Sequence, residues 1–175
     1  GEAVDVRDGD GYRAWLERTA QALGGCDIFV PNVSAGGGFD SEQTWLANFE
    51  VDVMHTVRGC DTLMPHLEKS GAGSVVIIAS TAALETFAVP MAYNALKAAT
   101  IVFAKQLSQH VGARGVRVNS VSPGPIYFEG GAWGNIKATT PGYFDAVVEQ
   151  IPCRRMGTPE EVARIVAFVA SPAGS

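Results

Sequence analysis

The sequence has few cysteines and little charge, and each shortage excludes a class of protein. Its three cysteines, Cys26, Cys60 and Cys153, are an odd number, lie far apart and form no C-x-x-C pair. Neither a disulfide framework nor a zinc site is therefore indicated. Lysine and arginine total 13 against 18 aspartates and glutamates, which gives a net charge of -5. Nucleic-acid binding needs clustered positive charge, so no nucleic-acid partner is expected.

Long apolar runs are also missing. No stretch reaches the roughly 18 residues that cross a bilayer, and the first residues lack the basic and apolar regions of a signal peptide. We therefore expect a cytoplasmic protein with no membrane partner. The three histidines, His55, His66 and His110, have no companion motif, so we expect them at helix surfaces or caps and predict no metal site.

Hydrophobic residues make up 47% of the 175-residue sequence, enough for one domain, residues 1–175, with a substantial core. Expected strands cover residues 3–6, 27–30, 74–79 and 116–121, and expected helices cover residues 11–23, 41–67, 90–111 and 159–170. The longest strands are continuously apolar, as in parallel strands buried on both faces. Alternation of strands and helices predicts an α/β fold with a doubly wound, mostly parallel sheet of the Rossmann type.

For two helices, the sequence also predicts where the helix begins or ends. In the first, Trp15, Leu16, Ala20 and Leu23 should face the core, and the helix should stop at Gly24-Gly25. In the last, Thr158 and Glu161 have the spacing of a capping box, so the helix should begin at Pro159.

The residues that indicate a chemical function are Ser80, Tyr93 and Lys97. Ser80 closes an apolar strand, and the i,i+4 spacing of Tyr93 and Lys97 places a phenol and an ammonium on one helix face. A tyrosine pKa of about 10 is too high for acid/base work near neutral pH, and a nearby cation lowers it. Two hydroxyls would stabilise the negative charge that builds on a carbonyl oxygen when a cofactor delivers hydride. The three residues predict a proton-transfer site for a carbonyl.

A Tyr-x-x-x-Lys pair alone more often marks a half-buried tyrosine beside a solvated lysine. Here the pair follows a buried strand that ends in serine, and four further blocks occur in order. They are DIFVPN at 27–32, GSVVI at 73–77, NSVSPGPI at 119–126 and RMGTPEEVA at 155–163. With these blocks, nearly the whole chain resembles the short-chain dehydrogenase/reductase family, particularly its 3-oxoacyl-carrier-protein-reductase-like members.

The resemblance implies an oxidoreductase that uses NAD or NADP to interconvert a small alcohol and a carbonyl. Tyr93 would be the acid/base, Lys97 the residue that tunes the phenol and holds the ribose, and Ser80 the group that polarises the carbonyl. The implied cofactor-binding positions are Asp5, Val6, Asn32, Val33, Ser34, Tyr93, Lys97, Pro123, Gly124 and Ile126. Asp5 suits an ordinary strand-ending turn equally well.

Some positions depart from the family pattern. Ser34 replaces a glycine that lets the backbone approach the ribose, and Pro31 removes an N–H group nearby. Asp52 stands where the family has a catalytic asparagine at a helix kink. We expect it either to pair with Lys97 and slow the proton relay, or to be an ordinary helical aspartate. Tyr127 and Phe128 replace a threonine and would form an aromatic wall for the substrate.

The resemblance aligns residues 3–6 with the family's third strand. The first two strands, the glycine-rich phosphate loop and the last strand therefore have no counterpart in the sequence, and the glycines at 36–38 do not open a helix as that loop does. Two interpretations stay open: a piece of a longer enzyme, or a truncated natural protein that cannot hold the cofactor unaided. NAD and NADP cannot be separated without the second strand.

An alternative function also stays open, namely a non-catalytic family member that acts as a binding or assembly subunit. The resemblance implies a homotetramer or dimer, formed through the helix of Tyr93 and the last helix. The first of these is apolar on more than one face, through Ala88, Val89, Ala92, Ala95, Leu96, Ala99, Val102 and Phe103. A central helix in a monomer has the same pattern. The substrate is open because residues 129–152 carry no recognisable specificity pattern.

Overall fold

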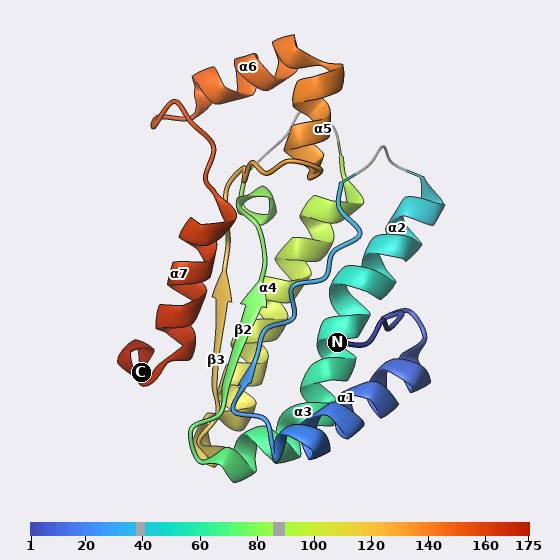
Figure 1. Ribbon diagram of the computed structural model, residues 1–175, viewed down its shortest axis with the longest axis vertical. Helices are drawn as coiled ribbons and strands as arrows, with labels where there is room; N and C mark the ends of the chain where they lie inside the picture. The colour runs from blue at the N-terminus through green and yellow to red at the C-terminus, as the bar shows by residue number, and fades with distance from the viewer. Residues whose placement is uncertain (38–40, 86–89) are drawn as a thin grey trace.

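The computed structural model describes residues 1–37, 41–85 and 90–175, and its centre is a sheet of three parallel strands (Figure 1). The strands are β1 (Ile28–Phe29), β2 (Ser74–Ile78) and β3 (Arg117–Val121), and β2 lies between the other two. Val75 of β2 is level with Phe29 of β1 and with Val118 of β3. All pairs are parallel, as the sequence predicts.

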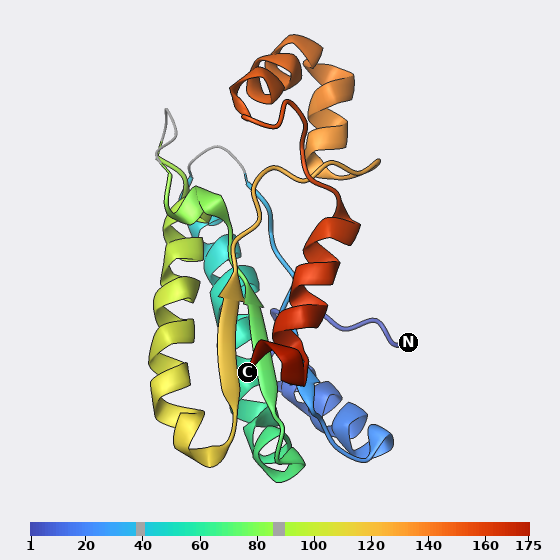
Figure 2. The ribbon, with the colours of Figure 1, turned by 90° about the vertical axis from the view of Figure 1, so that its left-hand side faces the viewer.

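Helices cover both faces of the sheet. The α-helices are α1 (Gly9–Leu23), α2 (Glu42–Asn48), α3 (His55–Ser70), α4 (Ala92–Val111), α5 (Ala132–Thr139), α6 (Pro141–Gln150) and α7 (Pro159–Ala170). A π-helical segment, Phe49–Met54, joins α2 to α3, and short 3₁₀ turns cover Thr81–Ala83, Gly112–Arg114 and Pro172–Gly174. Helices α3 and α4 pack on one face and α7 on the other (Figure 2). The predicted doubly wound α/β fold is confirmed.

Local sequence signals set several helix ends. Asp8 caps α1 by accepting a hydrogen bond from the backbone N–H of Gly11 at 3.1 Å, and Gly24 ends the helix with a left-handed φ of 81°. Thr158 and Glu161 form the predicted capping box, and α7 begins at Pro159 as expected.

The core lies between the sheet and the helices on its α3 and α4 face. Val75, Val76 and Ile77 are fully buried, as expected of a central parallel strand. Gly59 lets α3 approach β1 closely, because a Cβ atom there would lie 2.4 Å from the ring of Phe29. Tyr12, Leu16 and Ala20 bury one face of α1, which packs on α3.

Parts of the sequence prediction are wrong. Residues 3–6 form no strand, because in the described part of the chain no strand lies beyond β1 to pair with them; Val6 is nevertheless buried. Leu23 is 78% exposed rather than inward, since it ends α1 and lines an open hollow. Helix α4 begins at Ala92 instead of residue 90. His55 is buried, not at a helix surface.

The loops that follow β1, β2 and β3 meet at one edge of the sheet, where the strands have their carboxyl ends. The N–H of Ile78 donates to the carbonyl of Pro31 at 3.5 Å, and that of Thr81 to the carbonyl of Pro123 at 2.9 Å. Helices α5 and α6 lie beyond this edge (Figure 1). Among the described residues, no helix has the length and hydropathy to cross a membrane.

Candidate active site

Ser80 lies just beyond the carboxyl end of β2, where the chain turns away from the sheet. Its Oγ accepts a hydrogen bond from the N–H of Ala82 at 3.1 Å and so caps the 3₁₀ turn Thr81–Ala83. The side chain is almost fully buried. The adjoining hydrogen bond between Thr81 and Pro123 fixes this turn against the segment that follows β3.

Tyr93 is the second residue of α4, and its phenol interacts with the side chain of Ser80. The pKa of Tyr93 is raised, chiefly because the phenol is removed from water, whereas the Ser80 side chain lowers it and the negative charge of Asp52 raises it. Lys97 is not among the groups that shift this pKa, so the expectation that Lys97 makes the phenol more acidic stays a prediction.

Lys97 lies one helical turn after Tyr93, on the same face of α4. Its Nζ donates to the carbonyl oxygen of Ile78 at 2.9 Å and lies 3.1 Å from Oδ1 of Asp52. It also lies 5.6 Å from the centre of the Tyr93 ring. The predicted proximity of phenol and ammonium is confirmed, but the ammonium is directed mainly at Ile78 and Asp52.

Asp52 belongs to the π-helical segment, which supplies the irregular helix geometry expected at this position. Its Oδ1 accepts a hydrogen bond from Ser34 Oγ at 2.6 Å, and its Oδ2 accepts one from the N–H of Ala35 at 3.1 Å. Its carbonyl oxygen accepts from Thr56 Oγ1 at 3.1 Å. The pairing with Lys97 is confirmed, and the alternative of an ordinary helical aspartate is wrong.

The expected cofactor-binding positions fall into two groups. Asn32, Val33 and Ser34 follow β1, and Pro123, Gly124 and Ile126 follow β3, so both sets lie at the edge that carries Ser80. Asp5 and Val6 lie in the segment before α1. The guanidinium of Arg7 binds Asp5 at 2.8 Å and lowers the pKa of that carboxyl to about 2, while Val6 packs into the core.

The turn after β3 is fixed by the residues before α7. Ile126 bridges to Gly157, the N–H of Gly157 donates to the carbonyl of Pro125 at 2.9 Å, and the N–H of Tyr127 donates to the carbonyl of Gly157 at 2.9 Å. A side chain at position 157 would meet Ile126 at 2.6 Å. Two separate sequence blocks, 119–126 and 155–163, thus form one structure beside the site.

Sequence reasoning missed two features. Ser34 and Asp52, which both depart from the family pattern, bind each other directly, although 18 residues separate them in the sequence. Beyond Ile126, aromatic residues form a cluster: Tyr127 contacts Phe144 with ring centres 5.8 Å apart, and Lys137 lies 5.0 Å from the centre of the Tyr127 ring. Five aromatic residues between 127 and 144 signal this cluster in the sequence.

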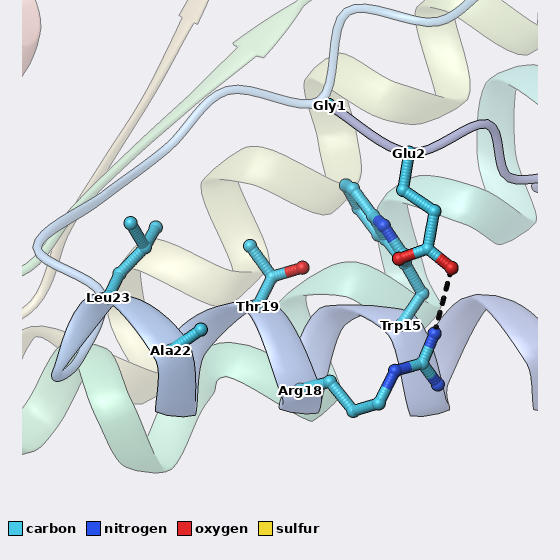
Figure 3. A pocket seen from close by; sticks show the side chains of 7 residues that line it. All are labelled: Gly1, Glu2, Trp15, Arg18, Thr19, Ala22 and Leu23. Atoms are coloured by element: carbon cyan, nitrogen blue, oxygen red, sulfur yellow. Dashed lines mark hydrogen bonds and ion pairs between the residues drawn. The ribbon is translucent and has the colours of Figure 1, made fainter.

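The structure also has an open hollow away from this edge. A hollow of about 380 Å³ lies between the N-terminal segment and α1 (Figure 3), where Glu2 and Arg18 form an exposed ion pair at 3.2 Å. Within the described ranges, no group of three or more histidine, cysteine, aspartate and glutamate side chains is arranged to hold a metal ion.

Comparison with known proteins agrees with this geometry. Residues 2–175 match the family model described as enoyl-(acyl carrier protein) reductase. The isoepoxydon dehydrogenase of Penicillium expansum is 35% identical over 100% of this chain and 68% of its own length. The 3-oxoacyl-(acyl-carrier-protein) reductase of Vibrio cholerae is 31% identical over 98% of this chain and 70% of its own.

Solved structures lead to the same family. The L-sorbose reductase of Gluconobacter frateurii, crystallised with NADPH and L-sorbose, superimposes with a TM-score of 0.86 at 29% identity, over 97% of this chain and 69% of that one. Sequence, fold and the gathering of Ser80, Tyr93 and Lys97 at the carboxyl edge of the sheet thus agree. The chain belongs to the short-chain dehydrogenase/reductase family.

Proposed function

We propose that this protein is an NAD- or NADP-dependent oxidoreductase that interconverts an alcohol and a ketone or aldehyde. The observation that carries the proposal is the gathering of the Ser80 and Tyr93 side chains beside the ammonium of Lys97, which lies 5.6 Å from the centre of the Tyr93 ring. Two neighbouring hydroxyls are placed to bind one substrate oxygen together. Such paired donors stabilise the charge that develops on that oxygen during reduction.

The residues at the strand ends fit the nicotinamide and ribose end of a dinucleotide. A lysine has three N–H donors, and in the described part of the chain Lys97 directs two of them at Ile78 and Asp52. The third is available for a ribose hydroxyl, with Asn32 and Pro123 on neighbouring loops. When bound, the cofactor supplies the hydride. Among the described residues, no strand precedes α1, so the strand, glycine-rich turn and helix that bind a pyrophosphate in this kind of fold are not formed there.

Tyr93 would hold and deliver the proton. Because its pKa is raised, the phenol is protonated at neutral pH, which is the form that donates to the oxygen of a reduced carbonyl. Ser80 would donate the second hydrogen bond to the same oxygen. The reverse reaction needs the phenolate, so the site favours carbonyl reduction at neutral pH and alcohol oxidation at higher pH.

The test uses the protein made from its complete open reading frame. Binding of NADH and NADPH is measured by fluorescence, and turnover is measured with isoepoxydon, L-sorbose and a 3-oxoacyl thioester, the substrates suggested by relatives. Tyr93→Phe should lower kcat by at least about 100-fold, the usual contribution of a general acid. Tyr12→Phe, on the buried face of α1, is the matched control.

Two outcomes would contradict the proposal. If the protein binds neither cofactor, the non-catalytic alternative of a binding or assembly subunit replaces it. If the protein binds a cofactor and turns over but Tyr93→Phe keeps its rate, the enzyme assignment stands and the acid/base assignment fails.

A dimer or tetramer is part of the proposal, and a cytoplasmic location stays a prediction. Large apolar side chains are exposed on α4 and α7, as the expected contact helices require: Val102 on the first, and Ile165 and Phe168 on the second. Two expected contact residues, Ala88 and Val89, lie outside the described residues. Light scattering on the protein and on a Phe168→Glu variant tests this, and a monomeric parent protein would contradict it.

A further inference from the structure

The Ser34 hydroxyl has partners for both its hydrogen and its lone pairs inside the protein. Its Oγ lies 2.6 Å from Oδ1 of Asp52 and accepts a hydrogen bond from the N–H of Gly36 at 3.1 Å. An ionised carboxylate only accepts hydrogen bonds, so the hydroxyl hydrogen points at Asp52. The side chain therefore does not offer that hydrogen to a ligand, although the sequence places Ser34 among the cofactor-binding positions.

Asp52 depends on this loop for its partners. Its carboxylate accepts from Ser34 at Oδ1 and from the Ala35 N–H at Oδ2, while the same Oδ1 binds Lys97 at 3.1 Å. The side chains of Asp52 and Lys97 are 1% and 5% exposed. A buried ion pair is tolerated only when further hydrogen bonds satisfy both groups, and Ser34 and Ala35 supply them to the carboxylate.

Lys97 is in turn held from two sides. The carbonyl of Ile78, which is part of the sheet, accepts one of its hydrogen bonds, and Asp52 holds it from the other side. These two contacts leave Nζ at 5.6 Å from the centre of the Tyr93 ring. The Asp52 carboxylate is itself held by the loop that carries Ser34.

We propose that Ser34 is a positioning residue for the acid/base site: its hydroxyl fixes the Asp52 carboxylate, and that carboxylate holds Lys97 beside Tyr93. The inference rests on the proposed function for its kinetic consequence. Turnover then depends on the Ser34 hydroxyl, whereas cofactor affinity does not.

Kinetics separate this role from direct cofactor binding. Ser34→Ala should lower kcat about tenfold and leave the Kd for NADPH or NADH within about twofold, because a hydrogen bond to a charged group is lost. Ser34→Thr keeps a hydroxyl and should restore most of kcat. In an Asp52→Asn background, Ser34→Ala should change kcat by less than about twofold, since partners in one network are not additive. Ser108→Ala, on exposed α4 surface, is the control.

Unfolding of the ligand-free protein gives a second readout that needs no turnover. The melting-temperature shifts of Ser34→Ala and Asp52→Asn should be non-additive in the double variant. Additive shifts would overturn the proposal, as would Ser34→Ala weakening cofactor binding tenfold at unchanged kcat. If the parent protein binds no cofactor, the proposed function fails, while the unfolding experiment still decides whether Ser34 acts through Asp52.

Discussion

Lys97 and Asp52 form an ion pair, with 3.1 Å between Nζ and Oδ1, that is almost completely removed from solvent. Burying two charges is costly, and the cost is offset here by the carbonyl of Ile78 on one side and by Ser34 and Ala35 on the other. The negative member of the pair also raises the pKa of Tyr93. One contact therefore affects both the stability of this region and the protonation of the phenol.

Asp52→Asn should move the pH dependence of catalysis to lower pH. Removing the negative charge that raises the pKa of Tyr93 lowers that pKa. Alcohol oxidation needs the phenolate, so its rate rises with pH through this pKa, and that rise should move to lower pH. Carbonyl reduction needs the protonated phenol, so its rate falls with pH through the same pKa, and that fall should also move to lower pH. Rate profiles in both directions measure this, with exposed Asp61→Asn as control. An unmoved or alkaline-shifted limb would contradict it.

Lys97→Met should destabilise the fold by about 3–5 kcal/mol, because it leaves the Asp52 carboxylate buried without its cation. Urea unfolding measures the free energy of unfolding. Lys105→Met removes an exposed lysine from the same helix and should change it by no more than about 0.5 kcal/mol. Adding Asp52→Leu to Lys97→Met should recover part of the loss. A stability equal to that of the parent would show that the pair is not buried as described.

Arg117→Met should loosen the end of α7. The Arg117 guanidinium, at the start of β3, donates to four carbonyl oxygens there, those of Val169, Ala170, Ser171 and Gly174, at 2.8 to 3.2 Å. Their loss should cost about 2 kcal/mol, since these are charge-assisted bonds to helix-end carbonyls. Urea unfolding measures the cost. Arg117→Lys keeps the charge without the planar fork, so it should lose less. Equal losses in the two variants would contradict this and would assign the whole effect to the planar fork, with none left to the charge.

Cys60 should resist thiol reagents in the folded protein. Burial raises the pKa of Cys60 to about 12, so very little reactive thiolate is present at pH 8. Cys153 is exposed and should react first. Mass spectrometry after brief treatment with N-ethylmaleimide, with and without urea, counts the modified thiols. Labelling of native Cys60 as fast as that of Cys153 would mean that α3 opens readily from the core.

Local patterns in the sequence predict most of the fold. The continuously apolar run of β2 and the capping box before α7 are short-range signals, and both elements form where they are expected. Residues 3–6 contain three apolar residues but remain unpaired with the sheet, because a strand needs a neighbour that no local pattern supplies. Leu23 continues the apolar stripe of α1, yet it is exposed because burial depends on what lies opposite.

The sequence likewise predicts only part of the candidate site. The i,i+4 spacing of Tyr93 and Lys97 follows from helix geometry alone, so the sequence predicts their common face. The raised pKa of Tyr93 does not follow from it, because burial and the charge of Asp52 come from other elements. The contact between Ser34 and Asp52 also joins a loop after β1 to the π-helical segment before α3.

The amino-acid sequence by itself determined the alternation of β1, β2 and β3 with the helices that join them, the family and the residue types available for proton transfer, since each is written in short patterns along the chain. Only the tertiary structure decided how those groups are used. It joined Ser34, Asp52 and Lys97 through one buried carboxylate and set the protonation of Tyr93. The physical reason is that desolvation and hydrogen bonding depend on which distant segments enclose a group.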